Sequence, residues 1–338
     1  MVIRLRKSGS SHSSDLAIPT ELELPVQLVL EVCRHAGSHD LIEVARRNLT
    51  HEGITSAVRL RDSAAIYGWL LKAVSFQGIS DYVAAHYMEK NGSVSYAEVE
   101  NALGVAGTCG KLTEFTSFVD CRFEKAKQCC SNLAAISCCP VPMLPLRNGR
   151  LSQTAISLYL FTRDIAQGDF VDWIDSNASF GPPQWAAMRL SSALGAVFGI
   201  SHKVAALGLS GLLLACSSFR PRWGEVGARF VVVDTLVHNF LGRTGILKHL
   251  GSEHSYGPAC YLPDGCADVL HRLAGYIDAK QFNAAYPSIF PRFIQQAIWR
   301  FCAELELDFC NGRRINDRVG CRQAHCAVFE LCTREPLK

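Results

Sequence analysis

The sequence predicts an all-α protein, and three observations lead to that fold class. Apolar residues recur at helical spacing in segments separated by Gly, Pro, Ser or Asn, at 22–48, 62–90, 95–103, 123–136, 152–175 and 184–198. Only short stretches such as 229–233 have the composition of a strand, and this one is too isolated to start a sheet. No repeat with the period of a solenoid is visible in the sequence.

The composition indicates a folded protein without a strong demand for charged partners. Of 338 residues, 49% are hydrophobic and 19% are charged, which excludes a disordered or low-complexity chain. The net charge is only +3, so binding to nucleic acid is permitted but would depend on a local basic patch. A chain of this length can bury one large core or form two lobes.

The amino-terminal segment MVIRLRKSGSSHSSD is basic and rich in serine, and it lacks the apolar stretch of a secretory signal. We expect residues 1–20 to form a disordered arm. The longest apolar run, 204–219, contains glycine and serine and is too short for a membrane span, so it predicts a buried helix. These features predict a cytoplasmic protein with no membrane partner, associated with the nucleoid if the source is bacterial.

A single carboxylate interrupts the apolar segment FVVVDTLVHNFLGRTGIL, residues 230–247. Apolar residues recur at helical spacing after Asp234, so a helix is expected to begin near Thr235. Asp234 then stands where its side-chain oxygen accepts the free N–H groups of the first helical turn. A catalytic carboxylate is the other interpretation, and the two roles are compatible.

A tight turn is expected in VFGISHKVAALGLSGLLL, residues 197–214, between an amphipathic helix and an apolar helix that begins at Lys203. The exposed N–H groups at the start of the second helix would form an anion site for a phosphate. Small residues in the turn would let a DNA backbone approach closely. The alternative is an ordinary corner between two helices, with Lys203 in solvent.

A second basic segment, SSFRPRWGEVGAR at 217–229, combines Arg220 and Arg222 with an aromatic residue. This composition suits contacts with phosphates and stacking on bases, and a solvated loop explains it equally well.

Three segments in order, WLLKAVSFQGISDYVAAHYMEKNG at 69–92, GISHKVAAL and VVVDTLVHNFLGRTGI, resemble the helix-hairpin-helix (HhH-GPD) DNA glycosylase superfamily of the endonuclease III and 8-oxoguanine glycosylase type. The resemblance implies a two-lobed helical fold. Residues 65–228 would form a helical-barrel lobe with the hairpin at 197–204. Residues 21–64 and 229–338 would pair into a second lobe, which ends in a cysteine-rich tail.

The resemblance also implies a role for individual residues. Asp234 matches the catalytic carboxylate of the family, and Lys203 matches the lysine that attacks the sugar in members with lyase activity. Gln77 matches the residue that fills the gap left by an extruded nucleotide. In the hairpin, Gly199 and Ser201 match the two glycines that contact DNA, and His202 completes the turn.

The sequence departs from the family pattern at three positions. Phe198 stands in place of the usual proline, Ser201 replaces the second hairpin glycine, and Leu236 stands where histidine is common. The first two departures change the part of the hairpin that would bind phosphate, although Ser201 still has a backbone N–H.

The implied function is that of a DNA glycosylase in base excision repair, a monomer that flips a damaged base out of double-stranded DNA and excises it. Lys203 would add an associated lyase activity at the abasic site through a Schiff base. One alternative is the removal of hypermodified, for example glycosylated, bases from viral DNA in antiviral defence; another is a non-catalytic DNA-binding protein. The candidate residues for a base pocket are Trp69, Phe76, Trp185 and Phe198, each of which can also be a core residue.

Four cysteines near the carboxyl terminus, Cys310, Cys321, Cys326 and Cys332, have the spacing C-x10-C-x4-C-x5-C. Thiolates at such spacing in a polar segment suit a [4Fe–4S] cluster or a structural zinc ion. Many members of the family end in C-x6-C-x2-C-x5-C around a [4Fe–4S] cluster, and only the last gap agrees here. Because four cysteines lie in this polar segment and the last gap agrees with the family pattern, a [4Fe–4S] cluster is expected, with zinc or free thiols as the alternatives.

Overall fold

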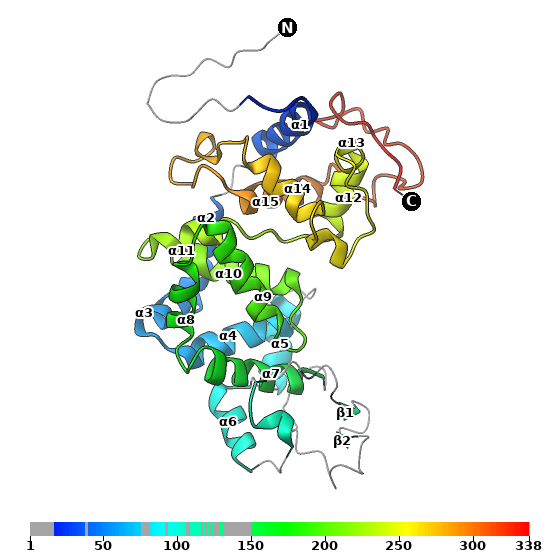
Figure 1. Ribbon diagram of the computed structural model, residues 1–338. Coiled ribbons are helices and arrows are strands. Elements are labelled where there is room, and N and C mark those ends of the chain that lie inside the picture. The colour runs from blue at the N-terminus through cyan, green and yellow to red at the C-terminus, as the bar shows by residue number, and fades with distance from the viewer. Residues whose placement is uncertain are drawn as a thin grey trace.

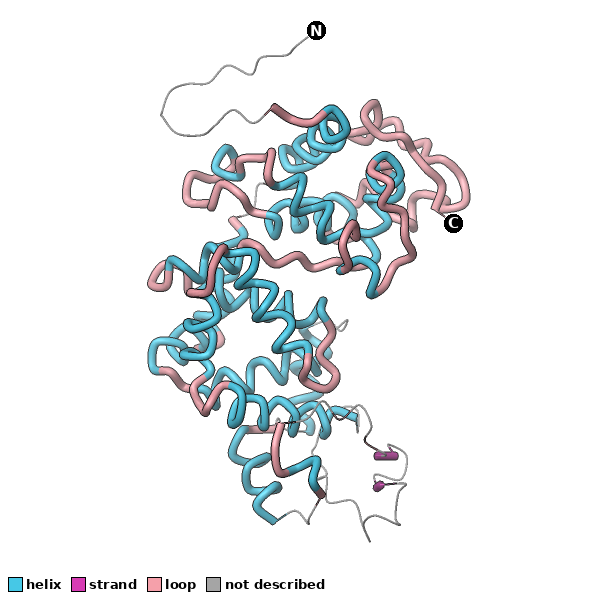
Figure 2. Tube along the Cα trace, viewed as in Figure 1, coloured by secondary structure: helices cyan, strands magenta, loops and turns pink. Residues whose placement is uncertain are grey.

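The structure is a computed structural model that describes residues 17–37, 40–75, 81–91, 94–105, 109–115, 118, 121, 123–124, 129–130 and 150–337. Its regular structure is almost entirely helical (Figures 1 and 2), which confirms the all-α prediction. Within the described residues the strands are β1 (Phe123–Glu124) and β2 (Cys129–Cys130), which pair antiparallel. No sheet is built on residues 229–233, as expected from the sequence.

The helices follow one another along the chain with short connections. They are α1 (Thr20–Ala36), α2 (Leu41–His51), α3 (Ile54–Leu60), α4 (Ser63–Ser75), α5 (Asp81–Asn91), α6 (Tyr96–Val105), η1 (Gly110–Leu112), α7 (Arg150–Leu160), the π-helix η2 (Phe161–Ile165), α8 (Phe170–Ala178), α9 (Pro183–Gly195), α10 (His202–Ala215), α11 (Pro221–Gly227), α12 (Thr235–Arg243), α13 (Ile246–His249), η3 (Pro258–Tyr261), α14 (Cys266–Ala274), η4 (Ala279–Gln281) and α15 (Pro291–Cys302).

The buried apolar side chains form two hydrophobic cores. The first core gathers residues of α2–α4, α7–α11 and the extended segment up to Val232. Helix α10 lies at its centre, in contact with α2, α4, α9 and α11. This central position agrees with the apolar run at 204–219, which was expected to be a buried helix, because Leu209, Leu212 and Leu213 are fully buried.

The second core gathers residues of α1, α12–α15 and the carboxyl-terminal segment. Helix α15 lies against α1, α12 and α14, and Figure 1 shows these helices together at one end of the molecule. Residues from both ends of the chain therefore pack in the same core. One connection between the cores is the extended segment 230–233. Its side chains alternate: Phe230 and Val232 belong to the first core, Val231 and Val233 to the second.

Helices α2 and α3 contribute Leu49, Ile54 and Val58 to the first core. Two local features differ from the sequence prediction. The helix predicted over 152–175 is broken where Gln167 and Gly168 adopt positive φ, and the Asp169 side chain then caps α8. Part of the segment predicted as a helix over 123–136 instead forms β1 and β2.

The amino-terminal arm was predicted over residues 1–20. Residues 1–16 lie outside the described residues, and Thr20 is the first residue of α1. The domain boundaries drawn from the sequence stay a prediction.

Candidate functional site

Asp234 ends the extended segment and begins α12. Its backbone is extended, and its Oδ1 accepts a hydrogen bond from the N–H of Val237 at 2.9 Å. The predicted capping role is thereby confirmed. The side chain is half-buried, at the boundary of the second core. The cap occupies one carboxylate oxygen and fixes the orientation of the whole group.

The predicted turn between helices is present, from the end of α9 at Gly195 to the start of α10 at His202. Gly199 has φ +83°, and a Cβ at this position would lie 2.5 Å from Oγ1 of Thr154, so no other residue fits without strain. The N–H of Phe198 donates to Ser157 Oγ at 3.1 Å. Two contacts with α7 thus hold the turn.

Lys203 is the second residue of α10 and is half-buried, whereas Ser201 and His202 at the helix start are exposed. Ser201 occupies the N-cap position, but its hydroxyl makes no capping hydrogen bond. The first-turn N–H groups of any helix lack partners inside that helix, and here the two residues at the helix start are exposed. The start of α10 therefore has the features expected of a phosphate contact.

One side chain, that of Tyr261, links the two predicted catalytic positions. Its ring stacks on the ring of His202, with centroids 5.6 Å apart and planes at 24°. Its phenol oxygen accepts a hydrogen bond from the N–H of Val233 at 2.9 Å. Lys203 follows His202 and Asp234 follows Val233 in the chain, so Tyr261 braces the immediate neighbours of both residues. This role of Tyr261, the last residue of η3, was not predicted, because a single tyrosine has no distinguishing sequence pattern.

The four carboxyl-terminal cysteines come together. Cys310, Cys321, Cys326 and Cys332 line one cavity beside α12 and α15. The buried guanidinium of Arg243 lies next to them, 3.2 Å from Cys310 Sγ. A hydrogen bond from Cys302, with Arg243 nearby, lowers the pKa of Cys310 to about 7 against the effect of burial.

A [4Fe–4S] cluster and a single metal ion need different spacings between four thiols. In a [4Fe–4S] cluster each thiolate binds a different iron, so the sulfurs lie farther apart than four ligands of a single ion. Among the described residues, these cysteines do not form a group close enough for one ion. The positive charge of Arg243 would offset the negative charge of a thiolate-bound cluster.

A second group of metal-binding side chains was not found from the sequence. His238, His254, Cys260 and Cys266 offer ligand atoms that all lie within 4.8 Å of one another. His238 is on α12, one turn after Asp234, and Cys266 is the first residue of α14. The group can bind a metal ion. The sequence signal was the spacing H-x15-H-x5-C-x5-C, which is wider than the common zinc motifs.

No protein-family model matches the chain, and comparison with curated proteins and with solved structures gives no match either. The function must therefore be inferred from the residues themselves. In the described part of the chain, no helix combines the length and apolar character needed to cross a membrane.

A cavity of about 370 Å³ opens next to Tyr261, between α9, α10 and α14. Its walls are largely apolar, with polar groups from Arg229, Asp268 and His271. Burial, with Arg229 nearby, lowers the pKa of His271 to about 4. His202 lines this cavity, whereas Lys203 and Asp234 do not.

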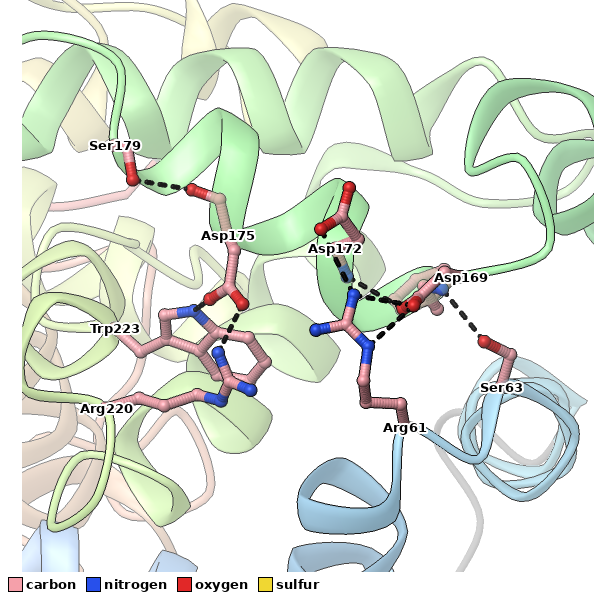
Figure 3. A network of polar contacts seen from close by, with 9 residues as sticks. Arg61, Ser63, Asp169, Asp172, Asp175, Ser179, Arg220 and Trp223 are labelled. Atoms are coloured by element: carbon pink, nitrogen blue, oxygen red, sulfur yellow. Dashed lines mark hydrogen bonds and ion pairs between the residues drawn. The ribbon is translucent and has the colours of Figure 1, made fainter.

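The two predicted DNA-binding arginines, Arg220 just before α11 and Arg222 within it, are engaged with their own chain, as Figure 3 shows for Arg220. Arg220 forms an ion pair with Asp175 of α8, which also accepts a 2.7 Å hydrogen bond from the indole N–H of Trp223. Arg222 donates to the Ala178 carbonyl at 2.9 Å. These contacts fasten α11 to α8, so both side chains already serve the fold.

Three of the four residues proposed for a base pocket lie in the described part of the chain. Trp69 packs against the first core, Trp185 is 59% exposed, and Phe198 is half-buried with its ring edge against Phe118. None of these three lines the cavity beside Tyr261. Phe76 and the predicted intercalating residue Gln77 lie outside the described residues.

Proposed function

We propose that the protein is a DNA glycosylase that excises a damaged or modified base from double-stranded DNA, with Asp234 and Lys203 as its catalytic residues. The observation that carries the proposal is the pair of contacts that Tyr261 makes with His202 and Val233. By stacking on His202 and binding the N–H of Val233, it holds the start of α10 and the start of α12 in fixed relation. Lys203 and Asp234 each follow one of these anchored residues in the chain, and the proposal requires both side chains to reach one nucleotide.

The chemistry follows from these two groups. Breaking the bond between base and sugar builds positive charge on the sugar, which the Asp234 carboxylate would stabilise. The amine of Lys203 would add to C1′ and displace the base, giving a Schiff base that allows strand cleavage by elimination. Because the cap fixes the Asp234 carboxylate before substrate arrives, little reorganisation is needed in the transition state.

The DNA backbone would be held at the hairpin. Gly199 brings the turn close to α7 and leaves the exposed start of α10 free to approach a phosphate. Arg220 and Arg222 are not part of this proposed surface, since both are engaged with α8 and the loop that follows it.

We further propose that Cys310, Cys321, Cys326 and Cys332 hold a [4Fe–4S] cluster, which would crosslink the carboxyl-terminal segment. Support comes from their shared cavity and from the adjacent buried Arg243. Anaerobically purified protein should contain about four iron and four sulfide per chain. Retention of iron in Cys326→Ser at the wild-type level would contradict the assignment.

The test of the catalytic proposal is borohydride trapping on duplexes that carry different modified bases, including oxidised purines and the glycosylated bases of viral DNA. Borohydride reduces a Schiff base to a permanent crosslink between protein and DNA. We expect a crosslink for the wild type, none for Lys203→Gln, and wild-type trapping for the matched control Lys248→Gln, whose lysine pairs with Glu335 in the second core region.

The remaining outcomes separate the alternatives. Trapping only on glycosylated bases would favour antiviral defence over repair. Base release without a crosslink would leave Asp234 catalytic and reduce Lys203 to a phosphate contact. DNA binding without base release on any duplex would overturn the enzyme and leave a non-catalytic DNA-binding protein.

A further inference from the structure

We propose that His238, His254, Cys260 and Cys266 form a structural zinc site that is separate from the carboxyl-terminal cysteines. Two imidazoles and two thiols converge here from α12, a loop, η3 and the start of α14. Both cysteines are buried and both histidines are half-buried, so water does not surround the ligand atoms. Two nitrogen and two sulfur ligands at one point are the donor set of structural zinc sites.

The distances fit one tetrahedral ion. Zinc binds thiolate at about 2.3 Å and imidazole nitrogen at about 2.0 Å, so a sulfur and a nitrogen on the same ion lie about 3.6 Å apart. His238 Nδ1 lies 3.3 Å from Cys266 Sγ and 3.6 Å from Cys260 Sγ, and His254 Nε2 lies 3.4 Å from Cys266 Sγ. These three distances match that value, and all four ligand atoms lie within 4.8 Å of one another, so small side-chain adjustments would complete the coordination.

A neighbouring carbonyl prepares one of the ligands. The Nδ1 of His254 lies 2.7 Å from the carbonyl oxygen of Ser252, a contact that places the ring proton on this nitrogen. The other nitrogen, Nε2, then presents its lone pair to the thiol groups. Metal-binding histidines usually donate their second ring N–H to a carbonyl or a carboxylate in this way.

The site would order the segment that carries Tyr261. Residues 251–265 contain only the short helix η3, and both Gly251 and Gly257 adopt positive φ. Two ligands, His254 and Cys260, lie within this segment, and Cys260 directly precedes Tyr261. Bound zinc would therefore hold the segment that contains Tyr261 against α12 and α14.

Metal content and X-ray absorption test the proposal on the full-length protein. Protein purified under reducing conditions should contain about one zinc per chain. Absorption at the zinc edge should show two sulfur and two nitrogen neighbours. This measurement on the wild type needs no variant. Four sulfur neighbours would assign the zinc to the carboxyl-terminal cysteines, and no zinc after incubation with zinc sulfate would also overturn the proposal.

Variants separate the two cysteine groups. Cys260→Ser should lose the zinc and keep the iron, whereas Cys326→Ser should do the reverse. The matched control is Cys216→Ser, which replaces a buried thiol of the first core and should leave zinc content unchanged. Full zinc content in Cys260→Ser would contradict the site.

Chelation gives an independent reading. Removing zinc from the wild type should lower the midpoint of thermal unfolding by about 5 °C or more, and adding zinc should restore it. Cys260→Ser should not respond to the chelator. A parallel loss of base release rests on the proposed glycosylase function, whereas metal content and thermal midpoint do not, so either proposal can fail alone. An unchanged wild-type midpoint after complete zinc removal would exclude a structural role.

Discussion

Asp234 has two roles that substitution can separate. Asparagine keeps an oxygen that accepts the N–H of Val237 but carries no charge. We expect Asp234→Asn to change the free energy of unfolding by less than about 0.5 kcal/mol while base release falls about 10²–10³-fold. Urea unfolding and single-turnover base release measure the two effects.

Asp234→Ala is the matched control, because it removes both the cap and the charge. It should lose about 1 kcal/mol of stability in addition to the activity. Equal activity in Asp234→Asn and wild type would leave Asp234 as a helix cap alone.

His271 makes stability depend on pH. Its pKa in the folded protein is about 4, below the ordinary value of 6.5, so folding favours the neutral ring. The contribution is complete above pH 6.5 and is lost as the pH falls from 6.5 towards 4, because the unfolded chain takes up the proton first. The loss should amount to about 2 kcal/mol, since the ring borders a cavity and is partly solvated.

The measurement is urea unfolding of the wild type and His271→Gln at several pH values between 7 and 4.5. The variant should lose less stability over this range than the wild type. Parallel curves for the two proteins would show that His271 does not contribute.

Residue roles that depend on neighbours in the chain were predictable from the sequence. Roles that depend on contacts between distant residues were not. The cap at Asp234 depends on the next three residues only, and the sequence displays them. Tyr261 acts on His202 and Val233, which lie far from it in the chain, so its role follows from packing. The group of His238, His254, Cys260 and Cys266 was missed for the same reason.

The hairpin element depends on one backbone conformation. Gly199→Ala would place a side chain at φ +83° and within 2.5 Å of Thr154 Oγ1. We expect a loss of about 1–3 kcal/mol in the free energy of unfolding. Adding Thr154→Ala should recover the part due to the clash, and a double-mutant cycle measures it.

Gly211→Ala is the control, because this glycine lies within α10 and a Cβ there meets no atom within 4 Å. It should be neutral or stabilise the protein by up to about 1 kcal/mol. Equal destabilisation by the two substitutions would mean that the turn at Gly199 is not special.

The attachment of α8 to α11 depends on Asp175 (Figure 3). Its carboxylate accepts from Trp223 and pairs with Arg220, so Asp175→Ala leaves two donors without their acceptor. We expect a loss of about 2 kcal/mol, measured by urea unfolding. Asp172→Ala, which removes an exposed partner of Arg61, should cost less than about 1 kcal/mol. Similar costs for both would contradict a special role for Asp175.

Helix existence was predictable from apolar periodicity, and helix boundaries were less so. The pattern over 152–175 continues through Gln167 and Gly168, so it does not show that these residues turn the chain between η2 and α8. Periodicity also does not reveal which core a helix joins, so the contribution of α2 and α3 to the first core could not be predicted.

For the molecule as a whole, the sequence predicted that helices pack together, but periodicity did not show which distant segments share a core. Helix α1 and helices α12–α15 share one core although helices α2–α11 lie between them in the sequence. The resemblance to a known family suggested such an arrangement, while periodicity and composition did not. Contacts between distant segments depend on the shapes of packed side chains, which no local pattern encodes.

Side chains along 230–233 alternate between the two cores. The effect of an insertion in this segment therefore depends on whether the number of inserted residues is odd or even. Inserting one residue after Val231 would turn Val232 and Val233 each towards the opposite core. Inserting two residues would keep every side chain on its own side and only lengthen the connection. We therefore expect a single inserted alanine to damage folding, measured by urea unfolding, more than two inserted alanines do.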